Sequence, residues 1–130
     1  MTITNLWNVG SVSAEVYNLI SDLPTALSGT GMNNIIYGAI TFVENYCNVN
    51  IGSSSISQQY HNAIVYKTMF DVLGAKDLVG AELGNISLGD FSINASTSAA
   101  IADARLNIKL LLDGELQILG RHVSFYKANS

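Results

Sequence analysis

Apolar residues recur at helical spacing in four stretches of the chain, and this pattern predicts four amphipathic helices. The first has Ser13 as its N-cap and Glu15 in its first turn, and it ends before Pro24, which has no amide hydrogen to donate. The second covers about residues 32–47, and the third starts near residue 56. The last follows several candidate caps at 94–98 and ends at Gly120, with Gly114 marking either a bend or a close contact.

The third predicted helix differs from the others because it is apolar nearly all round from residue 63 to residue 73. Such a helix is either central in a bundle or clamped between partners. Phe42 and Tyr46 widen the apolar surface of the second helix and suggest a further contact face there. The positions expected to be buried in the second and fourth helices are Ile36, Ala39, Ile40, Val43, Cys47, Ile101, Ala104, Ile108, Leu111, Leu112 and Leu119.

Between the third and fourth helices the chain predicts a β-hairpin, because Gly89 and Asp90 suit the two central positions of a type II′ turn. The rungs then pair like with like: Leu88 with Phe91, Ser87 with Ser92, and Ile86 with Ile93. A single strand with a bulge at Gly89 is the competing interpretation, but it leaves the serine match as coincidence. A two-stranded ribbon is marginal alone, so either the chain's own helices or a neighbouring subunit covers Ile86, Leu88, Phe91 and Ile93.

Both ends of the chain lack clear helical periodicity. Residues 1–10 are interpreted as an arm, with Trp7 docking either on the chain's own core or on a neighbour. The tail after Gly120 alternates weakly and, as a free strand, is unstable, so we expect disorder until it meets an edge or a groove of a partner. Its residues that are candidates for docking are Arg121, His122, Val123, Phe125 and Tyr126.

Composition adds an excess of apolar surface to this picture. Of the 130 residues, 48% are hydrophobic and only 12% are charged, so we expect some of the apolar surface to form an interface. The net charge of −4 and the pI near 4.8 argue against a protein that neutralises DNA phosphates, because such proteins cluster Lys and Arg. The length fits one domain with a core of its own.

Targeting signals are not evident in the sequence. The N-terminal residues lack the basic and apolar regions of a signal peptide, and no run approaches the roughly 18 to 20 apolar residues of a membrane helix. Cys47 is the single cysteine and lies on an apolar helix face, which indicates a small core residue in a chain made in a reducing compartment. We expect a soluble protein that does not span a membrane.

Catalytic and metal-binding patterns are also not found. His61 and His122 are not at metal-ligand spacing from other ligands on the same face, and the glycines form no phosphate-binding loop. A nucleophile elbow is missing. The charged residues of the last helix, Asp103, Arg105, Lys109 and Asp113, are interpreted as a solvated face. We therefore expect no enzyme activity, no cofactor and no metal.

Three features together resemble a known family. A helix runs into the sequence YCNVNI, the next helix contains Tyr60, Ala63 and Ile64, and the segment ISLGDFSI then feeds a long helix closed by Leu-Gly-Arg at 119–121. This arrangement resembles the small head-to-tail connector, or adaptor, proteins of tailed bacteriophages over roughly residues 12–121. The chain departs from the family in having few Lys and Glu on its helices and many Asn and Ser in its loops.

The resemblance implies a mainly α fold: a four-helix bundle-like domain with a short β-hairpin between helices 3 and 4 and an extended C-terminal tail. Residues 1–121 then form a single helical connector domain with an N-terminal arm, and residues 122–130 form a docking tail. It implies a structural virion protein, synthesised in the host cytoplasm, that forms a homo-oligomeric ring under the portal protein and meets a downstream tail or nozzle protein. DNA passes through the ring without specific binding.

In this interpretation the hairpin face of Ile86, Leu88, Phe91 and Ile93 contacts the next subunit, and Arg121, His122, Val123, Phe125 and Tyr126 dock on the portal. An acidic conduit does not hold the phosphates that pass through it. The alternative is a small helical binding module, monomeric or dimeric, that holds an apolar ligand or peptide between its second and third helices.

Overall fold

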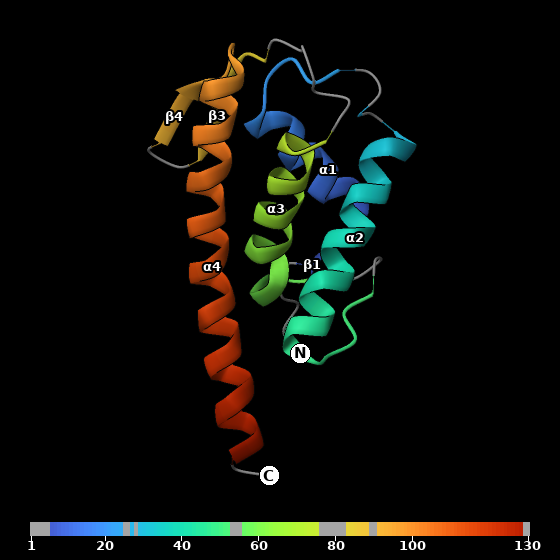
Figure 1. The fold of residues 1–130 in the computed structure, drawn as a ribbon. Helices are drawn as coiled ribbons and strands as arrows, with labels where there is room; N and C mark the ends of the chain where they lie inside the picture. Colours follow the sequence, from blue (N-terminus) through green and yellow to red (C-terminus); the bar gives the residue numbers. More distant parts are fainter. Residues whose placement is uncertain are drawn as a thin grey trace.

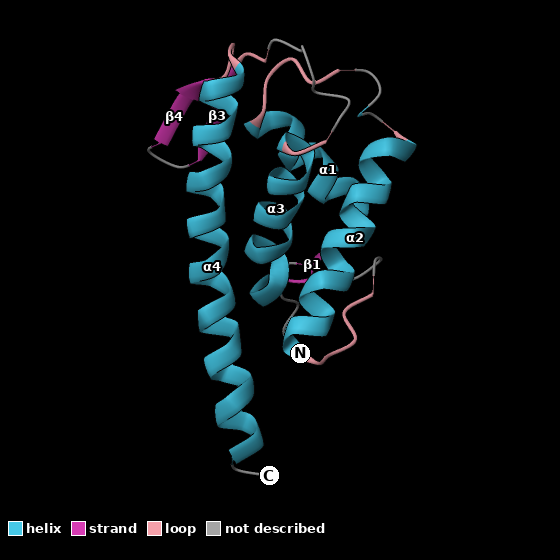
Figure 2. Ribbon diagram, in the orientation of Figure 1, coloured by secondary structure: helices cyan, strands magenta, loops and turns pink. Residues whose placement is uncertain are grey.

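The computed structural model describes residues 6–24, 27, 29–52, 56–75, 83–88 and 91–128, with the side chains of residues 6, 7, 88, 91 and 121–128 excepted. Four helices dominate it: α1 (Val9–Leu19), α2 (Thr30–Cys47), α3 (Gln58–Leu73) and α4 (Ser98–Ala128). Two short antiparallel pairs accompany them, β1 (Leu6–Trp7) with β2 (Ile56–Ser57), and β3 (Asn85–Leu88) with β4 (Phe91–Asn94). The predicted mainly α fold with a hairpin before the last helix is confirmed (Figure 2).

Helix α3 lies at the centre of the bundle, which is one of the two arrangements that its apolar surface predicts. It stands between α4 and α2, and α1 packs against both α2 and α3 (Figure 1). Its buried residues are His61, Ala63, Ile64, Val65, Thr68, Met69, Val72 and Leu73. The hydroxyl of Thr68 is satisfied within the helix, since it donates to the Ile64 carbonyl oxygen at 2.7 Å.

The buried stripes of α2 and α4 follow the predicted helical spacing closely. Ile36, Ala39, Ile40, Val43 and Cys47 are all buried on α2. On α4 the buried positions are Ala104, Ile108, Leu112, Leu116 and Leu119, while Ile101 is half-buried. The prediction is wrong for Leu111, which is 41% exposed because it lies at the margin of the buried stripe.

Helix α1 begins earlier than predicted. Asn8, in extended backbone, is the N-cap: its side chain accepts from the Ser11 amide, and the Ser11 hydroxyl accepts from the Asn8 amide, which completes a capping box. Ser13 therefore lies inside the helix and Glu15 is not in its first turn. The helix ends at Leu19, before Pro24, because Ile20 turns into extended backbone and pairs with β3.

The chain before α1 and the chain before α3 form one antiparallel pair. Leu6 lies opposite Ser57, and Trp7 lies opposite Ile56, so part of the predicted arm is tied to the bundle. The side chain of Trp7 lies outside the described residues. Ser57 is the N-cap residue of α3, so the helix begins close to the predicted start near residue 56.

Helix α4 is longer than predicted. Thr97 caps its start by accepting from the Ala100 amide, and the helix then continues through Gly120 to Ala128. The expectation that Gly120 ends the helix and that an extended tail follows is wrong for residues 121–128, whose backbone is helical. Gly120 instead lies close to α2, where an added Cβ would stand 3.1 Å from the Tyr46 hydroxyl oxygen. The glycine allows the two helices to approach, and it does not act as a C-terminal cap.

Candidate interaction surfaces

The hairpin has the predicted pairing at every rung. Ile86 lies opposite Ile93, Ser87 opposite Ser92, and Leu88 opposite Phe91, with Asn85 and Asn94 closing the ladder. The interpretation as one bulged strand is therefore excluded. Gly89 and Asp90, the two turn residues, lie outside the described residues, so the turn type stays a prediction.

The hairpin is joined to the end of α1 by backbone hydrogen bonds. The Ser21 amide donates to the Asn85 carbonyl oxygen at 3.0 Å, and the Gly84 amide donates to the Ser21 carbonyl oxygen at 3.1 Å. A Cβ on Gly84 would stand 2.7 Å from both the Ser21 Cβ and the Asp22 Oδ2. Only glycine fits this close crossing, so Gly84 fixes the hairpin on the bundle.

The apolar face of the hairpin consists of two residues that pack on the chain's own core and two residues whose side chains are not described. Ile86 is fully buried in the subunit's own core, and Ile93 is half-buried against that core. The chain itself thus covers Ile86, so the Ile86 side chain does not touch a neighbouring subunit and can affect such a contact only by holding the hairpin in place. Leu88 and Phe91 are described only in their backbone, so their contact with another subunit stays a prediction.

The predicted docking tail starts on the last turns of α4. Residues 121–128 continue the helix, and these turns project past the ends of α2 and α3 (Figure 1). The side chains of Arg121, His122, Val123, Phe125 and Tyr126 lie outside the described residues. Their role in docking therefore stays a prediction, but their backbone is a helix and not a free strand.

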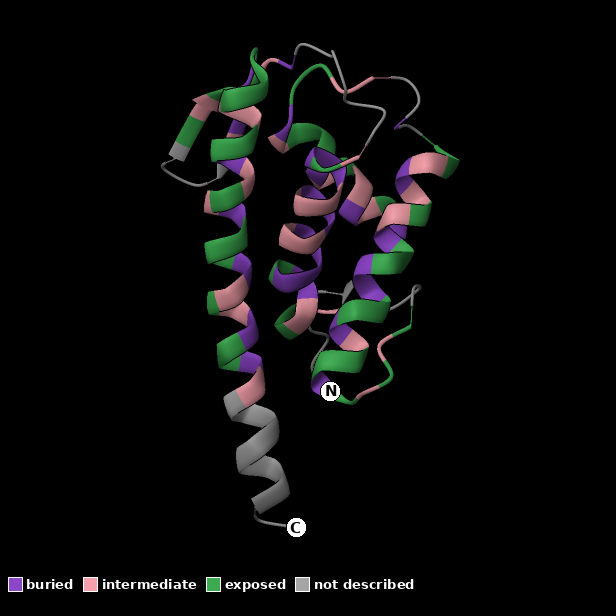
Figure 3. Ribbon diagram, viewed as in Figure 1, coloured by how far each residue is buried: buried purple, intermediate pink, exposed green. Residues whose placement is uncertain are grey.

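Large apolar residues are exposed along the side of α4 that faces away from α3. Leu106 is 60% exposed, Leu110 63% and Ile118 60%, and they stand at intervals of four or eight residues with the exposed Gly114 between the last two. We call Leu106, Leu110, Gly114 and Ile118 the outer face of α4. Figure 3 shows this outer edge as exposed and the side toward α3 as buried.

A second exposed surface lies on α2 and carries no charge. Its outward-facing exposed residues, which we call the outer face of α2, are Asn34, Tyr37, Gly38, Thr41 and Asn45. Phe42 and Tyr46 are exposed as well, but they lie at the margins of the helix, where they contact Lys67 of α3 and Gly120 of α4. Tyr37 is 49% exposed and Tyr46 is 47% exposed. The nearby Glu44 is turned to the following loop, where its carboxylate accepts from the amides of Ile51 and Gly52. Phe42 and Tyr46, on which the expected further contact face rested, contact α3 and α4 of the same subunit, so a contact of this helix with another molecule stays a prediction.

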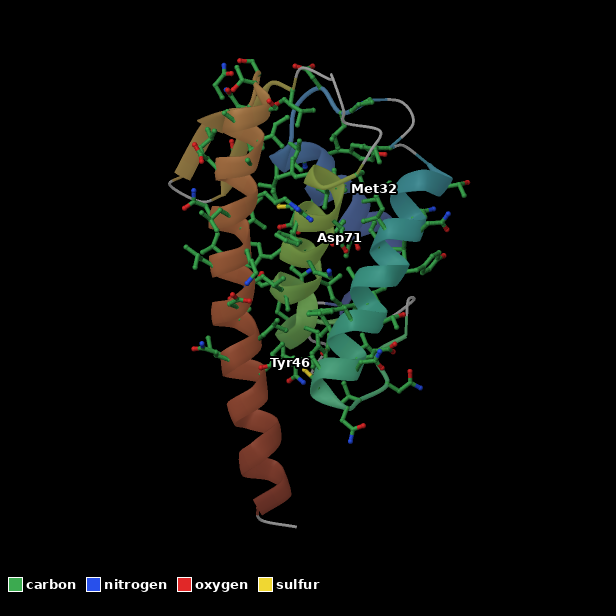
Figure 4. The ribbon with its side chains drawn as sticks, in the orientation of Figure 1. Met32, Tyr46 and Asp71 are labelled. Carbon is green, nitrogen blue, oxygen red and sulfur yellow. The ribbon has the colours of Figure 1, made fainter. Side chains whose placement is uncertain are left out.

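Cations and aromatic rings link the three helices α2, α3 and α4. The Lys67 ammonium lies 4.7 Å from the centre of the Phe42 ring and 5.7 Å from that of Phe70, and it pairs with Asp71 at 2.9 Å. Arg105 stacks on the same Phe70 ring at 3.9 Å. Figure 4 labels Asp71 on α3, and it places Tyr46 between the lower parts of α2 and α4.

Arg105 also closes the C-terminal end of α3. Its Nε donates to the Phe70 carbonyl oxygen at 3.0 Å, and its guanidinium occupies the position that a Cβ on Gly74 would fill. The prediction that Arg105 belongs to a solvated charged face is therefore wrong, because it packs against α3. Lys109 and Asp113 do form the predicted exposed pair, at 3.0 Å. Helical spacing alone gives no signal for a contact across helices such as that of Arg105.

His61 is a buried residue that joins α3 to α1. Its Nε2 lies 2.6 Å from the Glu15 Oε2, and only 3% of its side chain is exposed. His61 is therefore a buried link between the two helices. Nearby, burial together with the charges of Glu115 and Glu15 raises the pKa of Tyr66, which therefore stays protonated at neutral pH.

Other features bear on chemistry and location. Burial raises the pKa of the Cys47 thiol, as expected for a core cysteine, and so disfavours the reactive thiolate. Among the described residues no group of three or more His, Cys, Asp or Glu is placed to hold a metal ion. None of the described helices combines the length and the apolar run needed to cross a membrane.

Comparisons of the chain with protein families, curated proteins and solved structures found no match.

Proposed function

We propose that this protein is a head-to-tail connector of a tailed bacteriophage, which forms a ring under the portal and continues the DNA channel toward the tail. The observation that carries the proposal is the hairpin that leads into a 31-residue last helix. The segment ISLGDFSI, on which the resemblance to connector proteins rests, pairs in the register read from its residues and is anchored on α1 at Ile20. The long helix then projects beyond the bundle, toward a position where a partner can bind it (Figure 1).

Assembly into a ring is supported by apolar surface that the subunit leaves exposed. The outer faces of α2 and α4 carry four of the eight large exposed apolar residues among the described part of the chain, namely Tyr37, Leu106, Leu110 and Ile118, while Tyr17, Phe42, Tyr46 and Leu111 account for the others. A monomer gains nothing from such residues, whereas contact with another copy removes them from water. Ring assembly also fits a chain in which only 12% of residues are charged.

The charges support a conduit that does not hold DNA. Each basic side chain that the structure describes is engaged within the subunit: Lys67 with Asp71, Arg105 with Phe70, and Lys109 with Asp113. Proteins that bind DNA through its phosphates present clustered, unpaired Lys and Arg instead. With the net charge of −4, this favours passage of DNA without specific binding.

Docking on the portal is assigned to residues 121–126 at the projecting end of α4. Because their backbone is helical, the proposed mode is a helix that enters a groove of the portal, and not a strand added to a sheet edge. Binding in this mode needs no folding step for these residues, so less ordering entropy opposes it.

The proposal is tested by mixing the purified protein with the portal protein of the same phage and measuring the mass of the complex by light scattering. The expected result is a stable complex with many copies per portal, which electron microscopy images as a ring coaxial with the portal. A protein that stays monomeric and never binds the portal contradicts the proposal.

The alternative, a module that holds an apolar ligand between α2 and α3, has no observation in its favour. The apolar residues along this contact, such as Ile36, Val43 and Ile64, are fully buried in one core cluster. The edge of the contact is bridged by Lys67 over the Phe42 ring. A ligand would have to displace these contacts before it could bind.

A further inference from the structure

The outer faces of α2 and α4 lie on opposite edges of the subunit. Helix α3 packs against both helices from between them, so the side of each that faces away from α3 points outward in opposite directions (Figures 1 and 3). Two unlike faces on opposite edges suit a heterologous contact, in which one face of a copy meets the other face of the next copy. Repetition of such a contact closes a ring when the rotation between copies divides a full turn evenly.

The directions of the two helices agree with this contact. In Figure 1, α2 and α4 both run from the top of the bundle to the bottom, and α3 runs the opposite way. A rotation about an axis roughly along the bundle keeps the direction of each helix. It therefore brings α4 of one copy alongside α2 of the next as a parallel pair.

Each face has a glycine at its centre that the subunit itself does not need. A Cβ added to Gly38 on α2 or to Gly114 on α4 would meet no atom within 4 Å. Both glycines are inside helices, where glycine costs on the order of 1 kcal/mol relative to alanine. Close approach of a backbone or a bulky side chain from another molecule is a physical reason to have glycine at such a position.

The two glycines lie at similar heights in the subunit. Tyr46 packs on Gly120, which places these two residues at one level of α2 and α4. Eight residues before Tyr46 on α2 is Gly38, and eight residues before Gly120 on α4 is Leu112, so both lie about 12 Å higher in the bundle. Leu112 stands between Leu110 and Gly114 in the sequence. A rotation about the bundle axis preserves height, so Leu110 of one copy comes about 3 Å above the open space at Gly38 of the next, and Gly114 about 3 Å below it.

We propose that the outer face of α4 in one copy packs against the outer face of α2 in the next copy, with Leu110 and Ile118 on either side of the Gly38 level. The contact buries Leu110 and Ile118 of α4 and the Tyr37 ring of α2, and the α2 side contributes no charge that would have to be desolvated. The inference rests on the proposed function only in requiring that copies assemble, and it names the surfaces by which they do so.

The test is disulfide cross-linking between copies of the full chain. Thr41 and Gln117 are exposed on the two outer faces, and Cys47 is buried, so it does not interfere. The double variant Thr41→Cys with Gln117→Cys is oxidised in assembled particles, either free rings or rings on the portal. We expect the double variant to give a ladder of covalent dimers, trimers and larger products. A mixture of the two single variants should give dimers only.

Ser92→Cys with Gln117→Cys is the matched control, because both exposed positions lie on the α4 side of the subunit and are not expected to meet. Particles that form without a ladder overturn the α2–α4 contact and leave the proposed connector function standing. Covalent dimers from Gln117→Cys alone overturn it as well, since they indicate that α4 packs on α4. A chain that assembles neither by itself nor on the portal overturns both the α2–α4 contact and the connector function.

A second variant tests the glycine. Gly38→Leu places a side chain in space that is open in the subunit, so the folded monomer is expected to be as stable as the parent or more stable. The leucine side chain fills the position assigned to α4 of the neighbouring copy. We therefore expect the yield of cross-linked products to fall at least tenfold. An undiminished ladder with Gly38→Leu contradicts the proposed contact.

Discussion

Glycine has a different role at each of three positions near α4. Gly74 leaves room for the Arg105 guanidinium at the end of α3, and Gly120 allows Tyr46 to pack on α4. Gly114 has no neighbour within the subunit that excludes a side chain. The first two glycines therefore serve contacts within the fold, whereas Gly114 serves none among the described residues and lies on the face that we propose to contact another copy.

The free energy of unfolding should separate these roles. Gly114→Ala is expected to raise it by about 1 kcal/mol, because alanine favours the helix and its Cβ enters open space. Gly120→Ala should gain less, since the new Cβ would stand 3.1 Å from the Tyr46 hydroxyl oxygen and the ring must move. Urea denaturation at a concentration where the chain is monomeric measures both. Equal gains for the two variants would contradict the assigned role of Gly120.

At the scale of elements, the hairpin and the ends of the helices determine how the bundle is held together. The hairpin register was predictable from sequence because three rungs pair like with like around one turn. Its anchoring on Ile20 was not, since an isolated bridge of one residue leaves no periodic pattern. The cap at Asn8 was missed for a similar reason: Ser13 is an equally good cap by residue type, and only packing of Val9 and Val12 selects the earlier start.

Ile86 connects the hairpin to the core, so its truncation should destabilise the whole subunit. Ile86→Ala is expected to lower the free energy of unfolding by about 2 to 5 kcal/mol, because it leaves a cavity at a fully buried site. Ser92→Ala, at an exposed position of the other strand, should change it by no more than about 0.5 kcal/mol. Thermal and urea unfolding followed by circular dichroism provide the comparison. Similar stabilities for both variants would show that the hairpin is not part of the cooperative core.

Phe91 tests whether the hairpin also reaches a neighbour. Phe91→Asp is expected to impair assembly more than folding if the apolar end of the hairpin contacts the next subunit. Light scattering reports the assembly, and the unfolding midpoint of the isolated subunit reports the folding. A variant that fails to fold would place Phe91 in the core of its own subunit.

Arg105 links α3 and α4 through its side chain. Arg105→Ala should cost about 1 to 3 kcal/mol of stability, since it removes a charged hydrogen bond to the Phe70 carbonyl oxygen and the stacking on the Phe70 ring. Arg105→Lys should restore only part of this, because an ammonium has no planar face to stack. Lys109→Ala, which breaks an exposed pair on the same helix, should change stability by less than about 1 kcal/mol.

At the scale of the molecule, the sequence predicts the bundle better than its surfaces. Burial follows the 3.6-residue period, so the cores of α2 and α4 were predictable apart from Leu111. The outer face of α4 was not recognised, because leucines at positions such as 106 and 110 resemble core positions until the partner helices are placed. The helical end of α4 was missed because Gly120 has the appearance of a stop signal, whereas in the fold it makes room for Tyr46.

The projecting end of α4 is expected to serve binding to the portal and not the folding of the bundle. Deleting residues 122–130 should abolish binding to the portal and leave the bundle folded, because the last buried residues, Leu116 and Leu119, remain in place. The helical circular dichroism should fall only by the share of residues 122–128, and the unfolding midpoint should stay unchanged.

The matched control for this deletion is Phe125→Ser with Tyr126→Ser, which keeps the full length of the chain. If the side chains at the helix end make the contact, this variant should weaken binding as the deletion does, in a pull-down with immobilised portal. If only the deletion weakens binding, the length of the helix matters more than its apolar side chains. Binding that survives both changes would place the docking surface on the bundle itself, since the projecting turns would then be dispensable.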